Sequence, residues 1–232
     1  MVNTHYDEGT VNGEDLPNII YKTLHKEILN LSIKPGQALL ESDVCNRFNA
    51  SRTPVRTAFQ RLSDAGLLSI VPYKGAFATY LDFDYITQMI FMRHAVESKV
   101  IAEAIALDDP FLVEAIRYSL RCQRLLLDTP CTVEEFYTMD SQMHRLWFAS
   151  VKRELLWQTI QDFEVHYTRF RMLDIVEVGN FRQIVEEHEQ LFEAFEKRKA
   201  VDAERILETH LQGGVKRLGT KLIHEFSGYF KK

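Results

Sequence analysis

The chain has 232 residues, 46% of them hydrophobic and 26% charged, which is enough for one large domain or two small ones with apolar cores. No apolar run reaches the roughly 18 residues that a membrane-spanning helix needs, and the polar, acidic start lacks the pattern of a signal peptide. These features exclude a membrane protein and predict a cytoplasmic protein whose three widely spaced cysteines are free thiols.

The net charge of −5 is unevenly distributed along the chain. Residues 1–19 carry four acidic residues and no lysine or arginine, whereas residues 20–80 carry eight basic and four acidic residues, a net charge of +4. The rest of the chain has a net charge of −5. A small basic module attached to an acidic body indicates a polyanionic partner.

Three helices and a hairpin are predicted in the N-terminal part of the chain. Residues 1–17 lack hydrophobic periodicity and are expected to form a flexible arm. β-rich stretches around the turn 72–75 predict a two-stranded wing, so residues 18–80 are interpreted as a winged helix-turn-helix domain. Apolar residues recur at helical spacing in three segments, 19–31, about 41–48 and about 51–66.

The remaining residues, 81–232, show no strand pattern and are predicted to fold as an all-α antiparallel bundle of about six helices. The fold class is therefore mostly α. Thr132 and Glu135 form a capping-box pattern at the start of one of these helices. The helices are separated by short breaks, which lie near residues 108–110, 129–130, 151–152, 178–180 and 200–201.

The segment that starts at Ser51 has the pattern of a DNA-recognition helix. Ser51 is a suitable N-cap, and Pro54 is tolerated in a first turn because the amides there have no partner within the helix. Apolar side chains fall on one face, while Arg52, Thr53 and Arg56 lie toward the other. Helix amides bind phosphates and arginines bind guanines at such a face. A solvated basic face on a small α/β domain is the alternative.

The turn of the predicted wing contains Lys74 and Gly75. A lysine at a wing tip reaches a minor-groove phosphate, so this pair is a candidate for a second DNA contact. Lys-Gly is also a common turn pair, and the residues alone leave both interpretations open.

Several motifs follow one another between residues 19 and 80. They are Ile33-Lys34-Pro35-Gly36, Leu40-Glu41, Ser51-Arg52-Thr53-Pro54-Val55-Arg56, Leu62, Gly66-Leu67-Leu68 and Lys74-Gly75-Ala76-Phe77. This run resembles the winged helix of the GntR family of bacterial regulators. The resemblance covers residues 19 to 80 without a gap. The resemblance implies a homodimer on a palindromic operator in double-stranded DNA, with Arg52, Thr53 and Arg56 in the major groove and the wing in the minor groove. The family often has an arginine where this chain has Ser42, which puts the usual half-site sequence in doubt but not DNA binding itself.

Four side chains of the predicted bundle have the spacing of metal ligands. Asp140 and His144 are four residues apart, so they lie on one face of a helix about one turn apart. His188 and His210 are about equally far from the break near residue 200, so an antiparallel hairpin places them level with each other. Three imidazoles and one carboxylate suit a divalent transition metal, zinc before nickel or manganese.

Each of these histidines could instead be a hydrogen-bonded core residue, and an Asp–His pair at this spacing is also a common helix-surface contact. His166 is 22 residues from both His144 and His188 and competes for a place in the cluster. The other histidines are interpreted as surface or packing residues: His5, His25, His94 and His224.

The C-terminal part of the chain contains four further motifs. They are MRHAVE with Arg93 and Glu97, MDSQMHRL with Asp140 and His144, EEHEQLFEAF with His188, and ETHL with His210. These motifs resemble the FCD ligand-binding domain of the FadR-type branch of GntR regulators. The resemblance implies that the four ligands hold a metal that binds a small organic acid, and that Arg93 pairs with the other end of this effector. A salt bridge with Glu97 one turn away is the alternative for Arg93.

These features predict a DNA-binding transcription regulator, a repressor rather than an enzyme, whose operator affinity is controlled by a carboxylate effector bound at the metal. The effector would favour one dimer geometry over another. A metal-dependent hydrolase with Glu187 or Glu189 as general base is the leading alternative. It lacks an HExxH-type motif and leaves the DNA-binding module unexplained. A third interpretation is a DNA-binding scaffold with a structural metal and no effector.

Overall fold

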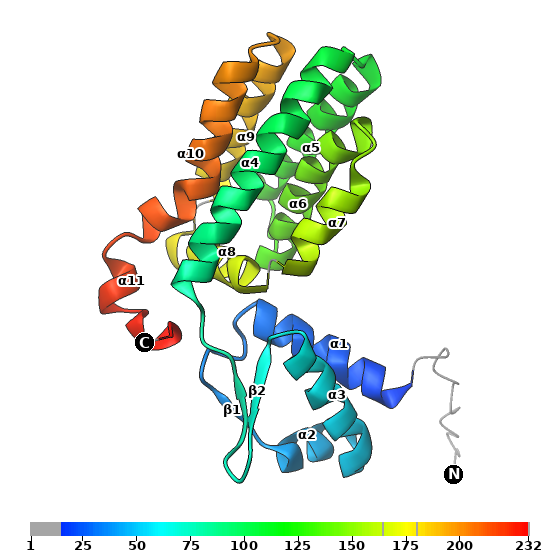
Figure 1. Cartoon of the computed structure of the whole chain (residues 1–232), viewed down its shortest axis with the longest axis vertical. Coiled ribbons are helices and arrows are strands. Elements are labelled where there is room, and N and C mark those ends of the chain that lie inside the picture. Colours follow the sequence, from blue (N-terminus) through cyan, green and yellow to red (C-terminus); the bar gives the residue numbers. More distant parts are fainter. Residues whose placement is uncertain (1–14, 164, 180, 232) are drawn as a thin grey trace, which may run out of the picture.

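A computed structural model describes residues 15–163, 165–179 and 181–231, and it places a winged module (residues 15–80) below a helical bundle (residues 83–218) (Figure 1). The predicted N-terminal arm, residues 1–17, lies outside the described residues except for its last three, which cap and begin the first helix. None of the described helices is long and apolar enough to cross a membrane.

The winged module combines three helices with a small antiparallel sheet, in which β3 (Gly75–Ala78) lies between β1 (Ala38–Leu39) and β2 (Leu68–Val71). The sequence predicted only the β2–β3 hairpin. The additional strand is two residues long, too short for an alternating pattern, and it joins the sheet because Ala38 pairs with Phe77 and Leu39 with Ala76. In chain order the elements are α1 (Leu16–Leu29), β1 (Ala38–Leu39), α2 (Glu41–Phe48), α3 (Arg52–Asp64), β2 (Leu68–Val71) and β3 (Gly75–Ala78).

Local capping explains where the helices of the winged module begin and end. The carboxylate of Asp15 accepts a hydrogen bond of 3.3 Å from the amide of Asn18 and caps α1. Asn49 ends α2 with a left-handed φ of 47°, a conformation that asparagine tolerates, and the chain turns at once into α3. Buried apolar residues of all three helices and the sheet form one core, which holds α3 in place.

The helical bundle confirms the predicted fold class. Between the predicted breaks near residues 151 and 178, the described residues form α7 (Glu154–Phe163) and α8 (Val165–Val178). The predicted capping box of Thr132 and Glu135 is present. The helices are α4 (Phe83–Leu107), α5 (Pro110–Asp128), α6 (Val133–Ser150), α7 (Glu154–Phe163), α8 (Val165–Val178), α9 (Phe181–Glu196) and α10 (Ala200–Leu218), followed by the short α11 (Lys221–His224) and a 3-10 turn (Ser227–Tyr229).

Helix α8 joins the bundle to the winged module (Figure 1). Arg169 on α8 donates hydrogen bonds to the carbonyl oxygen of Thr79, at 2.7 Å, and to its hydroxyl, at 3.0 Å. A second contact links the side chains of Asn30, just after α1, and Glu134, in the first turn of α6. The start of α6 and the middle of α8 therefore both contact the winged module.

Candidate metal centre and nucleic-acid interface

The outer face of α3 carries the residues predicted to bind DNA. Arg52, Thr53 and Arg56 are exposed, and Pro54 is half-buried in the first turn. Ser51 occupies the N-cap position with an extended backbone, but its side chain makes no cap hydrogen bond, contrary to expectation. Its hydroxyl is exposed beside Arg52. The opposite face is buried in the core and consists of Val55, Ala58, Phe59 and Leu62.

Glu41 orients Arg56 on this face. The Nε atom of Arg56 lies 3.0 Å from each carboxylate oxygen of Glu41, at the start of α2. Ser42, at the position where an arginine was the family expectation, donates a hydrogen bond of 3.2 Å to Asp43. Helix α2 thus contributes a positioning carboxylate here.

The tip of the wing extends into solvent. Tyr73 has a left-handed φ of 62° and a fully exposed ring, and Lys74 beside it is also exposed. Gly75 has a φ of 112°, a conformation that favours glycine, and it starts β3. A groove of about 450 Å³ lies between the wing and α3, lined on its two sides by Tyr73 and Arg56 among others.

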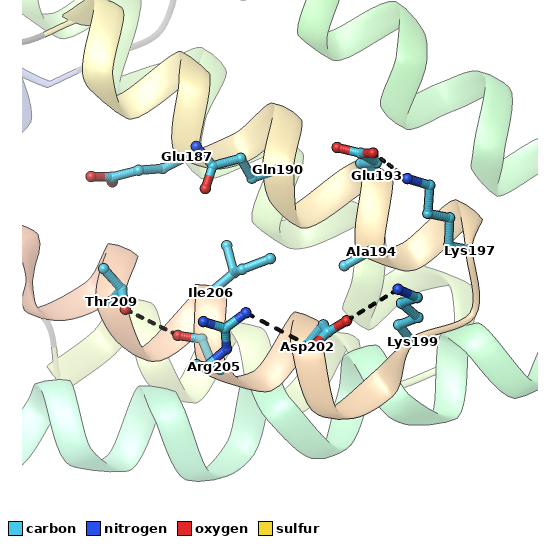
Figure 2. A pocket seen from close by; sticks show the side chains of 10 residues that line it. All are labelled: Glu187, Gln190, Glu193, Ala194, Lys197, Lys199, Asp202, Arg205, Ile206 and Thr209. Atoms are coloured by element: carbon cyan, nitrogen blue, oxygen red, sulfur yellow. Dashed lines mark hydrogen bonds and ion pairs between the residues drawn. The ribbon is translucent and has the colours of Figure 1, made fainter.

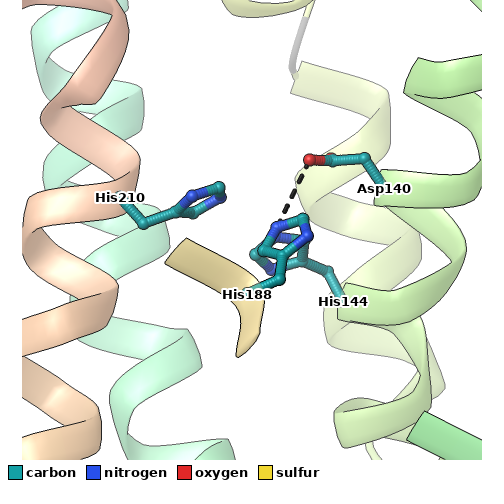
Figure 3. Close-up of side chains that lie close together, drawn as sticks. All are labelled: Asp140, His144, His188 and His210. Atoms are coloured by element: carbon teal, nitrogen blue, oxygen red, sulfur yellow. Dashed lines mark ion pairs between the residues drawn. The ribbon is translucent and has the colours of Figure 1, made fainter. Parts of the chain in front are cut away.

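The bundle brings together the side chains that were predicted as metal ligands (Figure 3). One ligand atom from each of Asp140, His144, His188 and His210 lies within 4.8 Å of the others. All four side chains are buried. Asp140 and His144 come from α6, His188 from α9 and His210 from α10, so three helices meet at this cluster.

Each imidazole of the cluster is oriented by a hydrogen bond at its Nδ1 atom, on the side of the ring away from the other ligands. The Nδ1 atom faces a side-chain oxygen outside the cluster in every case, and such an acceptor requires that Nδ1 carries the proton. The lone pair of a neutral ring is then on Nε2. In the described part of the chain, the buried Nε2 atoms of His144 and His188 have no hydrogen-bond partner. The pairs are His144 with Glu97 at 2.6 Å, His188 with Gln123 at 2.8 Å and His210 with Glu187 at 2.9 Å.

The protonation states of the cluster suit a cation. Burial lowers the pKa of His188 well below its usual value, and burial also lowers the pKa of His210. Burial alone would raise the pKa of Asp140, but the charge and hydrogen bonds of Arg171 hold it well below its usual value. Neutral imidazoles beside an ionised carboxylate are the state in which these groups bind a metal. The residues present therefore fit a divalent transition metal.

Arg171, on α8, is in direct contact with the cluster. Its guanidinium donates hydrogen bonds of 2.7 Å to each carboxylate oxygen of Asp140. Sequence reasoning missed this residue. The available signal was the pair Arg169 and Arg171, two positions apart in a segment where apolar and charged residues do not separate onto two helix faces.

Arg93, the predicted effector-binding residue, lies one side chain away from the cluster. Its Nε atom donates a hydrogen bond of 2.6 Å to Glu97, whose other oxygen contacts His144. The salt bridge that was the alternative for Arg93 is therefore present. Burial would raise the pKa of Glu97, but Arg93 and His144 lower it to about 2. A role of Arg93 in binding an effector stays a prediction.

His166 lies apart from the four clustered side chains. Its ring packs edge-on against Tyr85, with ring centroids 5.2 Å apart. It lines a cavity of about 440 Å³ at the junction with the winged module, together with Tyr80, Asp82 and Lys231. The structure thus places His166 outside the cluster.

A groove of about 400 Å³ lies between α9 and α10 (Figure 2). Its charged side chains pair with one another: Lys197 with Glu193, and Lys199 with Asp202 at 3.6 Å. Glu187 lines this groove and also accepts the hydrogen bond of His210. The hydrolase alternative named Glu187 as a base, whereas the structure uses it to orient an imidazole.

A winged helix-turn-helix joined to an all-helical bundle defines a DNA-binding transcription regulator, and two family models match the chain accordingly. The model of bacterial regulatory proteins of the gntR family matches residues 17–77, and the FCD domain model matches residues 88–213, just over half of the chain. The chain belongs to the GntR family and carries an FCD domain. This is a family of transcription regulators and not of enzymes, so the hydrolase alternative is set aside.

Similar proteins span nearly the whole chain. An HTH-type transcriptional repressor, RspR of Escherichia coli, is 29% identical over 83% of this chain and 84% of its own length. A transcriptional regulator of Streptomyces ambofaciens is 30% identical over 87% of this chain and 84% of its own length. The galactonate operon transcriptional repressor of E. coli is 25% identical over 84% of this chain and 93% of its own length.

Two solved structures have the same fold. E. coli McbR/YncC superposes with a TM-score of 0.69 at 17% identity and covers 90% of this chain and 99% of its own. A GntR-type regulator of Rhodococcus superposes with a TM-score of 0.68 at 19% identity and covers 88% and 97%. At these identities the likeness establishes the architecture alone.

Proposed function

We propose that this regulator is a cytoplasmic, homodimeric repressor whose affinity for a palindromic operator is controlled by a small carboxylic acid bound at a metal ion. Asp140, His144, His188 and His210 hold the metal, with zinc as the first choice and nickel or manganese as alternatives. The metal supplies a coordination position to which an effector carboxylate binds.

The observation that carries this proposal is the orientation of the three imidazoles. Each Nδ1 is fixed by Glu97, Gln123 or Glu187, which leaves Nε2 as the ligand atom. A buried neutral imidazole has a donor and an acceptor to satisfy, but the Nε2 atoms of His144 and His188 have no hydrogen-bond partner among the described residues, and that of His188 lies 3.5 Å from a carboxylate oxygen of Asp140. A cation between them satisfies both.

Burial of the cluster supports a link between effector and DNA. Asp140, His144 and His188 have no exposed surface, so an effector reaches them only in a conformation in which the helices separate. Helix α6, which carries Asp140 and His144, and helix α8, which contacts Asp140 through Arg171, also contact the winged module through Glu134 and Arg169. An effector that binds one arrangement of α6 and α8 better than another shifts the population of DNA-binding states.

At the operator, Arg52, Thr53 and Arg56 read bases from the major groove and Ser51 contacts the backbone at the start of α3. Lys74, presented by the turn before Gly75, contacts a minor-groove phosphate. Repressor action is supported by two similar proteins that are named repressors.

A thermal-shift screen of small carboxylic acids, run on zinc-loaded and on chelator-treated protein, tests the proposal. We expect a few related acids to raise Tm only in the loaded protein and to change its affinity for operator DNA in an anisotropy titration. His188→Asn should lose both effects, whereas His166→Asn should retain them. If no acid shifts the loaded protein and chelation itself lowers Tm strongly, the metal is structural and the effector proposal is wrong.

A further inference from the structure

The outer face of α5 carries a row of exposed apolar side chains. Phe111, Tyr118 and Leu125 are 84%, 62% and 64% exposed. They are spaced by seven residues, or about two helical turns, so they form one line along the helix. The opposite face of α5 packs into the bundle through Leu112, Ile116, Leu120 and Gln123. Large apolar side chains exposed in a row indicate a surface that another molecule covers.

The two edges of this row differ in character. Glu114 and Arg121 lie along one edge, and the small residues Ala115 and Cys122 lie along the other, as helical spacing of 100° per residue requires. The side chain of Glu114 is 64% exposed, although it also contacts Arg117. The guanidinium carbon of Arg121 lies 5.9 Å from the centroid of the Tyr118 ring. Phe111, Glu114, Ala115, Tyr118, Arg121, Cys122 and Leu125 are called the α5 seam below.

The α5 seam is complementary to itself in the antiparallel direction. When a second α5 lies antiparallel with Tyr118 facing Tyr118, the two-fold axis keeps the charged edges on the same side. Glu114 lies about 6 Å before Tyr118 along the helix and Arg121 about 4.5 Å after it, so each Glu114 then faces an arginine of the other helix. In the parallel arrangement the edge with Glu114 and Arg121 faces the edge with the small residues of the other helix, and no ion pair forms.

The apolar and small residues follow the same symmetry. Phe111 and Leu125 lie about equally far on either side of Tyr118, so the phenyl ring of one copy packs on the leucine of the other. Ala115 and Cys122 become neighbours across the axis, and small side chains there let the helix backbones approach closely. Every position of the α5 seam thus has a suitable counterpart in a second copy of this chain.

We propose that the α5 seam is the surface through which the helical bundles of two copies pair, antiparallel and centred on Tyr118. The inference rests on the proposed homodimer and identifies the face that forms it. It also places the contact on a helix that packs directly against α6 and α9, which carry three of the four clustered side chains.

Cross-linking tests the register directly. Ala115→Cys places a thiol opposite Cys122 of the other copy, and oxidation should give a covalent dimer on non-reducing gels. The double variant Ala115→Cys, Cys122→Ser should not cross-link. Wild type should not cross-link either, because two Cys122 residues lie about 12 Å apart along the axis of the paired helices. A cross-link that persists without Cys122, or none from a dimeric single variant, overturns the register.

Charge reversal tests the pairing in solution. Glu114→Arg alone and Arg121→Glu alone should each raise the dimer Kd at least tenfold in analytical ultracentrifugation, and the double variant should return most of the affinity. Equal dimer Kd values for wild type and all variants would show that another face forms the dimer, which overturns the seam and leaves the proposed homodimer intact. A wild type that stays monomeric with operator DNA present would overturn both.

Discussion

Arg171 and Asp140 form a bidentate ion pair in the middle of the bundle, with both N–O distances at 2.7 Å and both side chains buried. This pair joins α8, which contacts the winged module, to α6, which carries two of the clustered side chains. Because each carboxylate oxygen has two lone pairs, Asp140 can accept from Arg171 and still offer a ligand atom.

Arg171→Met should therefore destabilise the metal-free protein strongly. The variant leaves the carboxylate of Asp140 buried without its cation, a change that typically costs about 3–5 kcal/mol. Zinc should restore much of the loss, because the metal then compensates the same charge. Urea unfolding measures the free energy of unfolding of each protein with chelator and with zinc. Arg153→Met, which removes a half-exposed partner of Glu103, serves as control and should change stability by less than about 1 kcal/mol. Equal losses with and without zinc would contradict a metal at Asp140.

Arg169→Met should separate effector binding from its effect on DNA. Arg169 holds Thr79, the residue just after the wing, through two hydrogen bonds, and it does not contact the clustered side chains. We expect the acid-induced rise in Tm to persist, while the effector-dependent change in operator affinity shrinks at least severalfold. Arg145→Met, at an exposed site on α6, should leave both intact. If Arg169→Met responds to effector as wild type does, α8 is not the route of coupling.

Arg52→Ala and Arg56→Ala should each abolish specific operator binding without unfolding the protein. Both side chains are exposed, so their loss has little effect on the core, whereas a bidentate arginine–guanine contact contributes about 1–3 kcal/mol of discrimination. Anisotropy titrations against an operator selected from random DNA, compared with a scrambled duplex, measure this. Arg61→Ala is a matched control, because Arg61 lies 4.0 Å over the ring of Tyr21, on the side that faces α1. Unchanged affinity in either variant would contradict the assignment of α3 as the reading helix.

The sequence predicted the fold because its two modules have different periodicities and are punctuated by recognisable breaks. The four clustered side chains could be found because a helix puts residues i and i+4 on one face, and an antiparallel hairpin relates His188 to His210 by symmetry about its turn. Each relation depends on local geometry, whereas the grouping of the two pairs into one cluster rested on the resemblance to the FCD domain.

Other parts of the site depend on tertiary packing, which no periodicity records. Two arginines in a segment whose apolar and charged residues do not separate onto two helix faces indicate that one of them is buried, but they do not indicate that Arg171 pairs with Asp140. Glu97, Gln123 and Glu187 likewise become imidazole partners only once α4, α5 and α9 pack around the cluster. The two-residue β1 strand has no local signal at all.

The pH dependence of stability is the last prediction, and it concerns metal-free protein. Burial lowers the pKa of His188 and of His210 in the folded state, whereas both titrate near pH 6.5 when unfolded. Below that pH the unfolded chain binds more protons than the folded one, so stability is fully present above about pH 7 and falls as the pH drops. Each histidine contributes a slope of at most about 1.4 kcal/mol per pH unit.

Urea unfolding in chelator should therefore show that the free energy of unfolding falls more between pH 7.5 and pH 5.5 for wild type than for the double variant His188→Asn, His210→Asn. Asparagine places an N–H near the Nδ1 position, so it can still donate to Gln123 or Glu187 while removing the titration. His224→Asn, at an exposed position, should keep the wild-type slope. A double variant that loses as much stability on acidification as wild type would show that burial does not lower the pKa of these two imidazoles in the folded protein, which contradicts the prediction.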